Sequence, residues 1–573
     1  MGDPQSTYPP PQALGATLTR RSMLRAFAAG AVLTTGGFAL SACQKDSGEG
    51  GGSADVTLRV GGVPNPDPYP VMPSAAKQQK DPNARGYAEA LQGWLKQNPG
   101  VKLTHINADI QDTEALVASI GGGTAPDLFI GNVLGSWGSG NIRNAFVQGL
   151  AADVTELAEK YQFGKKLNPV VKPAWDFWQI DGKRYGLPYE YSGAGQGLYY
   201  RRDFLEDAGI SDIPFDRTWT WQRVREIAKA TTSGKRKGIA LVNWNYWAPL
   251  SANAHGLLTD VPAPDTNWNW RADLTTHADT WVRAIELFRG MVFADESVRT
   301  DITFDDGQAN AAFTRAEVGM WMGNPAALVH SPNDPAAAKF VSPTGKPYEE
   351  IVGWIPLPFG QDGFYDGTAR YGNAMISFRP DADDDVLEKA VGMHAYMMGP
   401  GLTTQMKVIN EETKDLRNVY GGYVGGSMIP TNTMIPVFAE SLEDLPGSAE
   451  EAWGKPIVDA YSAGTKLNPT PPQEQFFPAE ESPGPAGTAS DDAINRWAFE
   501  RKVRDLRSEL AKLEQTVNKT NDGFTSSIDD EVFLESARKY YAALDKVWHA
   551  GAPDFHAEVY APWYADKVRP ALG

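Results

Sequence analysis

The chain has 573 residues, of which 42% are hydrophobic and 22% are charged. This is the composition of a globular protein long enough for three or four domains of ~150 residues, and it excludes disorder throughout. The 71 acidic and 53 basic residues leave a net charge of −18. Because so acidic a chain repels phosphate backbones, nucleic acid is not expected as a partner. The single cysteine excludes an internal disulfide and any metal site built from several cysteines.

The N-terminus has the pattern of an export signal that ends at a lipidated cysteine. Residues 19–25 read Thr-Arg-Arg-Ser-Met-Leu-Arg, which resembles the twin-arginine export signal, although these arginines also suit the general secretory route. The apolar stretch 26–40 is shorter than the ~20 residues of a membrane span. Leu40-Ser41-Ala42-Cys43 matches the bacterial lipobox. We therefore predict a signal peptide over residues 1–43, a flexible tether over 44–55, and anchoring to the outer face of the cell membrane through lipidated Cys43.

From residue 56 onward, strand and helix patterns alternate. The periodicity and the turn residues predict strands at Val56–Val60, Val101–Ile106 and Leu128–Ile130, with helices at Gly86–Gln97 and Thr113–Ile120 between them. This order is typical of an α/β lobe with a mainly parallel sheet. In such sheets ligands bind beyond the carboxyl ends of the strands. The loops 61–73 and 131–141, which follow the first and third predicted strands, are therefore candidates for ligand binding.

The same patterns continue along the rest of the chain. They predict helices at Thr220–Thr231, Trp281–Phe293, Val386–Met398, Asp491–Val517 and Asp529–Trp548, and strands at Val318–Met322 and Ala374–Phe378. The acidic run Asp381–Asp385 lacks the glycine and the closing glutamate of a calcium loop, so we interpret it as a helix N-terminus. The seven histidines are scattered, and neither a metal nor a cofactor is expected.

Several segments, in the same order, resemble the extracellular solute-binding proteins of family 1, the maltose-binding type among them. The motifs that carry the resemblance are Gly122–Leu128, Asp181–Pro188, Gly197–Asp203, Ala208–Ile210, Arg217–Thr220, Gly319–Gly323 and Gly372–Phe378. The match departs from the family pattern at Arg201, Arg202 and Arg217.

This resemblance implies a type II periplasmic-binding-protein fold, in which two α/β lobes are joined by a hinge of several chain crossings and close on a ligand. Motif by motif, the crossings fall near residues 189–197, 370–377 and 422–429. The first lobe is then expected over residues 56–190 and 372–425. The second lobe is expected over residues 191–371 and 426–573, with the C-terminal helices.

A sugar offers hydroxyl groups and flat C–H faces, and its site therefore needs aromatic rings and planar polar side chains. Residues 242–249 crowd three large aromatic residues and two asparagines together, which is unusual for a buried strand. We nominate ligand-binding residues from three places: this segment, the chain crossings, and the loops that follow strands. For each residue a purely structural role stays open. The nominated residues are Asn132, Trp137, Tyr189, Glu190, Trp244, Asn245, Tyr246, Trp247, Asn324, Tyr371 and Asn373.

The resemblance implies a monomeric receptor, not an enzyme, that binds a carbohydrate and delivers it to the membrane permease of an ABC importer. Two alternatives stay open. One is a surface-anchored polysaccharide-active enzyme, although no Gly-x-Ser-x-Gly or His-Glu-x-x-His motif occurs and no carboxylate pair stands in a recognisable setting. The other is a lipoprotein that presents its ligand to a sensor kinase.

Overall fold

The computed structural model describes residues between Val56 and Arg569. The longer stretches outside the description are 1–55, 62–68, 135–144, 190–196, 242–273, 324–339, 361–374, 420–435, 464–495 and 522–534, and shorter gaps lie between them. The chain divides into two compact units, Met1–Ala54 and Asp55–Gly573. The predicted signal peptide, tether and Cys43 therefore lie outside the described residues, and all that follows concerns the second unit.

The first group of strands contains β1 (Val56–Gly61) and β2 (Val101–Ile106), which pair in parallel. Next to them, β3 (Leu128–Ile130), β12 (Met375–Phe378) and β6 (Leu187–Pro188) form a three-stranded sheet in the order β3-β12-β6. The backbone N–H of Asp127 donates to the carbonyl oxygen of Arg59 at 2.8 Å and joins the two sheets. The strands predicted in this part of the chain are confirmed.

β1 and β2 pair in parallel as expected, whereas β12, whose direction the sequence did not predict, makes the sheet of β3, β12 and β6 antiparallel. β12 runs antiparallel to both of its neighbours, with Ile376 opposite Ile130 and Met375 opposite Pro188. The chain leaves this sheet after β6 and comes back only at β12, after passing through the second sheet. Because β12 begins at the edge where β3 and β6 end, it must run in the reverse direction.

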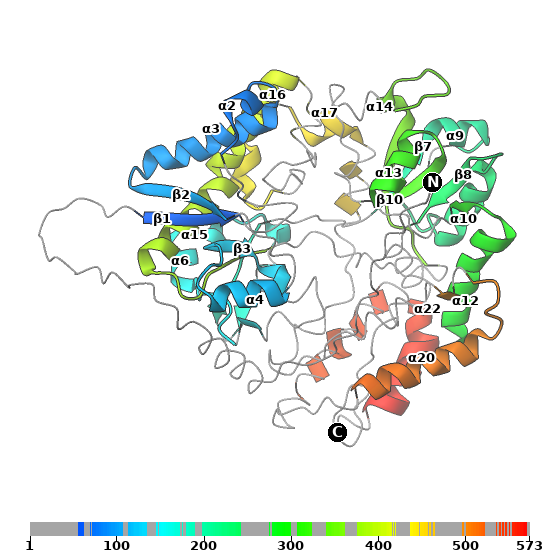
Figure 1. Ribbon diagram of the computed structural model, residues 1–573. Helices are drawn as coiled ribbons and strands as arrows, with labels where there is room; N and C mark the ends of the chain where they lie inside the picture. Colours follow the sequence, from blue (N-terminus) through cyan, green and yellow to red (C-terminus); the bar gives the residue numbers. More distant parts are fainter. Residues whose placement is uncertain are drawn as a thin grey trace, which may run out of the picture. The chain divides into compact units, whose positions relative to one another are not determined.

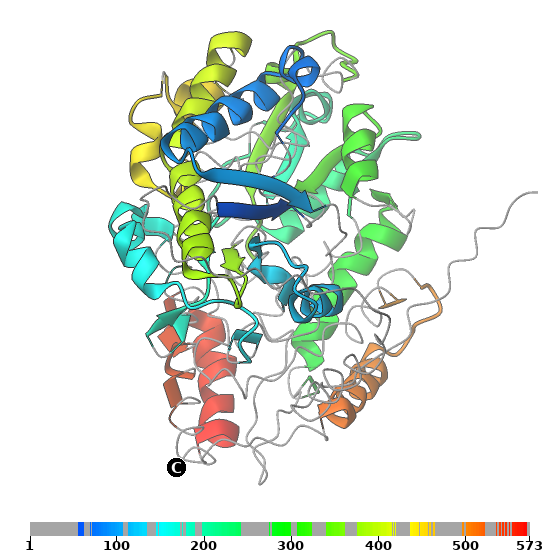
Figure 2. The same cartoon turned by 60° about the vertical axis from the view of Figure 1, so that its left-hand side comes forward.

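The longer described helices of this part of the fold are α3 (Pro82–Gln97), α4 (Thr113–Gly121), α15 (Asp384–Met398) and α16 (Pro400–Thr413). α3 begins earlier than predicted because the Asp81 carboxylate accepts the N–H of Asn83 at 3.0 Å and Pro82 occupies the first turn. α3 lies beside α16 (Figures 1 and 2). Gly86 permits this approach, since a Cβ there would lie 2.8 Å from the carbonyl oxygen of Gln405.

The second sheet has five strands in the order β11-β7-β10-β8-β9. They are β7 (Gly197–Arg201), β8 (Lys237–Ala240), β9 (Val298–Arg299), β10 (Val318–Gly323) and β11 (Val352–Pro356). β7 is antiparallel to β10 and β11, whereas β10, β8 and β9 run in parallel. The helices of this region include α10 (Trp221–Thr231), α12 (Ala278–Arg289) and α13 (Asp306–Thr314). The predicted helix Trp281–Phe293 continues past α12 as a π-helical turn, Gly290–Ala294.

Alternate residues of the second sheet belong to two different hydrophobic clusters, as the period of two in a strand requires. Leu198, Tyr200 and Ile355 pack in a cluster with α10 and α12. Tyr199 and Trp354 pack on the opposite face, in the cluster that also contains the first group of strands.

The C-terminal part of the chain differs from two expectations. The helix predicted over Asp491–Val517 is wrong as one element: residues 501–505 are not helical, and α20 spans Leu506–Asn521. Here Arg289 donates to the carbonyl oxygens of Glu500 and Val503 at 3.1 and 3.2 Å, so these oxygens bind a side chain instead of continuing a helix. Leu506, Leu510 and Leu513 then pack into the cluster of α10 and α12. The described residues of the helix predicted over Asp529–Trp548 are helical.

The second difference concerns the stretch 437–445, which we assigned to the second lobe. The Phe438 ring packs edge-on against Phe163 at 5.0 Å, and the Ser441 hydroxyl donates to the carbonyl oxygen of Met398 at 2.8 Å. Both partners lie in segments assigned to the first lobe, so this stretch packs against those segments, and the lobe boundaries stay a prediction. Among the described residues, no helix is both long and apolar enough to cross a membrane.

Candidate functional site

Three strand ends of the first region meet at one edge of the sheet, which we call the first edge: Ile130, Pro188 and Met375. Their register places them together, because Met375 pairs with Pro188 and the adjacent Ile376 pairs with Ile130. The chain continues from Ile130 into a short 3-10 helix, Gly131–Leu134, which contains Asn132. From Pro188 it continues into Tyr189. Segments that carry predicted ligand-binding residues thus start from one place.

The second sheet has a comparable edge, which we call the second edge: Gly197, Ala240, Gly323 and Pro356. Gly197 pairs with both Gly323 and Pro356, and Ala240 pairs with Trp321, two residues before Gly323. The chain enters β7 at this edge and leaves β8 and β10 there. The predicted residues of 244–247 and Asn324 follow those two strand ends in the sequence.

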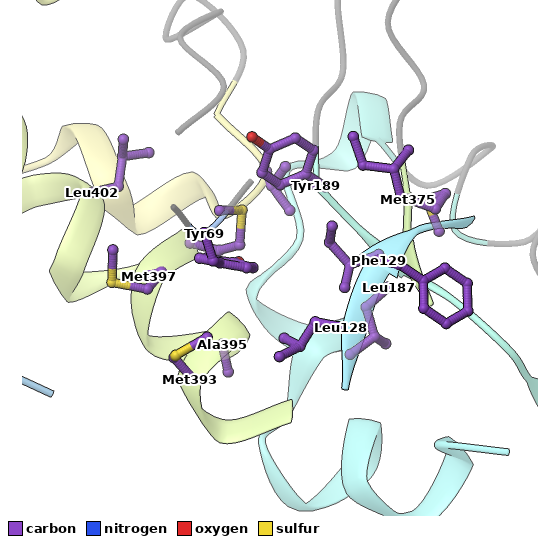
Figure 3. Packing of buried hydrophobic residues seen from close by; sticks show 14 of the residues in the cluster. Tyr69, Leu128, Phe129, Leu187, Tyr189, Met375, Met393, Ala395, Met397 and Leu402 are labelled. Carbon is purple, nitrogen blue, oxygen red and sulfur yellow. The ribbon is translucent and has the colours of Figure 1, made fainter. Parts of the chain in front are cut away.

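Most of the predicted ligand-binding side chains lie outside the described residues, and their involvement stays a prediction. This holds for Trp137, Glu190, Trp244, Asn245, Tyr246, Trp247, Asn324, Tyr371 and Asn373, and for the side chain of Asn132. The side chain of Tyr189 is described, and it is only 1% exposed. It packs in the first hydrophobic cluster (Figure 3), with its ring centroid 6.5 Å from that of His394. This burial favours the structural role for Tyr189.

His394 is a polar residue in the apolar core beside the first edge. It lies in α15, is fully buried, and stacks against Phe163 with the ring centroids 5.7 Å apart. Its Nε2 lies 2.9 Å from the carbonyl oxygen of Pro188, and its Nδ1 lies 2.5 Å from the Tyr69 hydroxyl. Burial lowers the pKa of His394 to about 4, and the hydrogen bond to Pro188 opposes this shift only in part.

Tyr69 comes from the segment between β1 and α2 (Ala75–Gln78), one of the two loops that we nominated for ligand binding. It packs in the same cluster as Met393 and Met397 of α15 (Figure 3). Burial and the neighbouring Tyr87 raise the pKa of the Tyr69 phenol well above its usual value, so the hydroxyl keeps its proton. The protonated Tyr69 hydroxyl can therefore donate a hydrogen bond to Nδ1 of His394.

A buried carboxylate organises the start of β3. Asp127 is 1% exposed and accepts from the Arg59 backbone at 2.6 Å and from Nε of Arg379 at 2.8 Å. Arg379 also pairs with Asp381 at 2.6 Å, in the acidic run that precedes α15. These contacts join β1, β3 and the end of β12. The expectation that Asp381–Asp385 starts a helix is confirmed, since α15 begins at Asp384.

A second buried ion pair lies at the end of β7, where the sequence departs from the family pattern. Arg201 and Asp203 approach to 2.8 Å with almost no exposure to solvent. Arg201 also donates to the carbonyl oxygens of Phe313 and Val341 at 3.1 and 2.8 Å. The aromatic ring of Phe204 lies 4.6 Å from its guanidinium carbon. With every polar group paired, this cluster joins β7, α13 and the segment before β11.

Sequence reasoning did not nominate His394 or Tyr69. A signal for His394 was present, because it is a histidine within the apolar periodicity of the helix predicted at Val386–Met398. Its partners are separated from it by 325 and 206 positions in the chain, and no local pattern brings such positions together. Among the described residues, no group of three or more His, Cys, Asp or Glu side chains could hold a metal ion.

The fold and the two edges define a class of α/β binding proteins, and comparisons with known proteins agree with this class. The family model of the bacterial extracellular solute-binding proteins matches residues 76–383. The chain therefore belongs to this family, and the predicted fold class is confirmed. The family is extracytoplasmic. No curated protein matches the chain.

Solved structures share the fold at low sequence identity. One is an ABC substrate-binding protein of Listeria monocytogenes in complex with cycloalternan, at 15% identity and a TM-score of 0.51, with 81% of this chain and 99% of that chain covered. Another is the sugar-binding protein MalE of Xanthomonas citri, at 16% identity and a TM-score of 0.51, with 81% and 97% covered. A third is UgpB of Mycobacterium tuberculosis in complex with glycerophosphocholine, at 14% identity and a TM-score of 0.51, with 82% and 99% covered.

Proposed function

We propose that this protein is a lipid-anchored receptor that binds a sugar or oligosaccharide reversibly, closes on it by hinge motion, and delivers it to an ABC importer. The observation that carries the proposal is the arrangement of the two edges. The chain passes from the first sheet to the second after Pro188, and the described strands lead into segments rich in aromatic and amide residues at both edges. Such segments offer the rings and planar polar groups that sugars need.

The ligands named for the structural neighbours support a solute of this size and chemistry. Cycloalternan is a carbohydrate, and the Xanthomonas citri protein is called a sugar-binding protein. Glycerophosphocholine in the third neighbour shows that the fold also accepts a phosphodiester. The net charge of −18 does not favour an anionic solute. Glycerophosphocholine is zwitterionic, so charge does not decide against it; a neutral carbohydrate is our choice because two of the three neighbours are described with a sugar.

Titration calorimetry against a solute panel tests the proposal. The panel contains maltose, maltotriose, a chitin oligosaccharide and cycloalternan, with glycerophosphocholine as the competing class. We expect saturable binding of at least one carbohydrate, with no release of new reducing ends or unsaturated products. Binding of glycerophosphocholine alone would contradict the choice of solute class, and turnover of a carbohydrate would contradict the receptor function.

A pair of substitutions locates the site. Replacing Trp244 and Trp247 with alanine removes two stacking surfaces, and we expect the Kd for the carbohydrate bound in the panel to rise at least tenfold. Tyr564→Ala is the control, because it truncates a partly exposed aromatic residue near the C-terminus. Equal affinity in the Trp variant and the wild type would exclude the segment 244–247 from the site.

The anchor is a separate part of the proposal and rests on the lipobox that ends at Cys43. Mass spectrometry of the mature N-terminus in the native host should find a diacylglyceryl cysteine at position 43. A mature N-terminus at any other residue would contradict it. The monomeric state and the lobe boundaries also remain proposals, with the stretch 437–445 moved to the first lobe.

A further inference from the structure

His394 joins two segments that are far apart in the sequence. Its Nδ1 is 2.5 Å from the hydroxyl of Tyr69, in the loop after β1. Its Nε2 is 2.9 Å from the carbonyl oxygen of Pro188, the last residue before the first chain crossing. Both contacts are buried. One side chain of α15 thus reaches the nominated loop and the root of the crossing at once.

The chemistry of the partners fixes the imidazole tautomer. The Pro188 carbonyl can only accept a hydrogen bond, so Nε2 must carry the proton and donate it. Nδ1 of a neutral imidazole is then an acceptor, and the Tyr69 hydroxyl is its donor. Because each nitrogen has one suitable partner, the imidazole orientation specifies the positions of both segments.

His394 is surrounded largely by aromatic rings, and its two hydrogen bonds therefore lie in an apolar environment. Phe163, Phe378 and Tyr189 all have ring centroids within 6.5 Å of the His394 ring. An apolar side chain would fill this space without a hydrogen-bonding requirement. A buried polar group instead penalises every arrangement that leaves it unpaired, and it therefore selects one geometry.

We infer that His394 is a positioning residue for solute binding, which holds the loop of Tyr69 in register with the first crossing at Pro188–Tyr189. Its link to affinity rests on the proposed function, because the loop and the crossing are the segments that a bound solute would contact in the first lobe. The coupling between the two segments is a property of the free protein. It can therefore be tested without a solute.

Hydrogen exchange followed by mass spectrometry tests the coupling. Tyr69→Phe removes only the hydroxyl and leaves Nδ1 of His394 without its donor. We expect the peptide that contains Tyr69 and the peptide that contains Tyr189 both to exchange about tenfold faster, because an imidazole with an unpaired Nδ1 can rotate or change tautomer and so weakens its remaining bond to Pro188. Tyr161→Phe is the matched control, because Tyr161 donates to the Glu388 carbonyl oxygen, also in α15, at 3.4 Å and not to the loop of Tyr69 or to the first crossing.

Two substitutions of His394 separate the halves of the bridge. His394→Asn places an amide oxygen near the position of Nδ1 and can accept from Tyr69, whereas His394→Gln places an amide N–H near Nε2 and can donate to Pro188. We expect His394→Asn to protect the Tyr69 peptide better than His394→Gln does, and the Tyr189 peptide less well. If Tyr69→Phe quickens exchange in the Tyr69 peptide alone, or if the control gives the same pattern, the inference is overturned.

An affinity measurement completes the test, with maltotriose as the probe. We expect its Kd to rise about tenfold in Tyr69→Phe and to stay at the wild-type value in Tyr161→Phe. An unchanged Kd in Tyr69→Phe would overturn the role in solute binding. If the wild type does not bind maltotriose, the carbohydrate that binds in the panel replaces it as the probe; if none binds, the proposed function fails and the exchange pattern alone decides the positioning role.

Discussion

The two edges from which the candidate site starts are held in different ways. In the first region, His394 bonds to Pro188 at the first edge, and at the opposite end of β3 and β12 the Asp127 carboxylate accepts from the Arg59 backbone and from Arg379. At the second edge, aromatic rings pack over glycines. Hydrogen bonds between fixed donors and acceptors specify one geometry and respond to protonation, whereas ring packing depends on shape. The first region should therefore respond to pH and the second to changes of volume.

The second edge shows its dependence on shape in a row of three rings. Trp354, Tyr199 and Trp321 are paired across β11, β7 and β10 on one face of the sheet, and the Tyr199 and Trp321 rings stack at 5.4 Å. A Cβ at Gly197 would collide with the Trp354 ring, and one at Gly323 would lie 2.8 Å from the ring of Trp321. Gly197 and Gly323 face each other in the register. Glycine at both positions makes room for the tryptophans.

The largest expected effect concerns the buried ion pair of Arg201 and Asp203, a polar contact in a region that otherwise depends on ring packing. Asp203→Ala leaves a buried guanidinium without its counter-ion, and we expect the free energy of unfolding to fall by ~3–5 kcal/mol. The matched control is Glu226→Ala, which removes a carboxylate from the exposed pair with Arg223 and should cost ~0.5 kcal/mol or less. Urea unfolding measures both. Similar losses would mean that the buried pair has no special weight and that the second region depends on ring packing alone.

The next effect tests the pH response of the first region. The pKa of His394 falls from 6.5 in the unfolded chain to about 4 in the folded protein. Between these pH values the unfolded chain binds more protons, so the free energy of unfolding decreases as the pH falls from 6.5 to 4, by ~3 kcal/mol from this residue. His394→Met should remove that part of the pH dependence, as measured by urea unfolding at pH 7, 5.5 and 4.

The control for this pH measurement is His549→Gln, which replaces an exposed histidine near the C-terminus. It should keep the pH dependence of the wild type, apart from small changes. If His394→Met and the wild type lose the same free energy of unfolding on acidification, the contrast between the two regions is wrong and the carboxylates dominate the acid response.

The sequence predicted local elements well and long-range polar contacts poorly. The strands Val101–Ile106 and Leu128–Ile130 have the predicted bounds, because β-branched and apolar runs bounded by turn residues depend on neighbours in sequence. The break at Arg501–Asp505 was missed, because Arg289, more than 200 positions earlier, binds the carbonyl oxygens there. The direction of β12 was not predicted, for a similar reason, since it follows from where the chain returns.

The candidate site was predictable as a set of segments and not as a set of contacts. Strand ends and aromatic patterns located the segments, because both are local features. Tyr189 illustrates the limit: the motifs nominated it at the first crossing, but its burial against α15 depends on tertiary packing. His394 and Tyr69 required the fold itself, since each became informative only through a partner distant in sequence.

The smallest effect isolates one hydrogen bond at the second edge. Nε1 of Trp354 donates to the carbonyl oxygen of Gly323 at 3.2 Å, whereas Nε1 of Trp321 is buried without a hydrogen-bond partner among the described residues. Both indoles are nearly fully buried in the same row, so Trp→Phe removes similar apolar volume at each position. The free energy of unfolding should therefore fall further in Trp354→Phe than in Trp321→Phe, by ~1–2 kcal/mol, because only the first leaves a carbonyl oxygen without its donor. The difference should be the same at pH 7 and pH 5, as no proton is exchanged. Equal losses of the free energy of unfolding in the two variants would show that ring packing alone stabilises the second edge. A difference that changes with pH would mean that the second edge responds to protonation as the first one does.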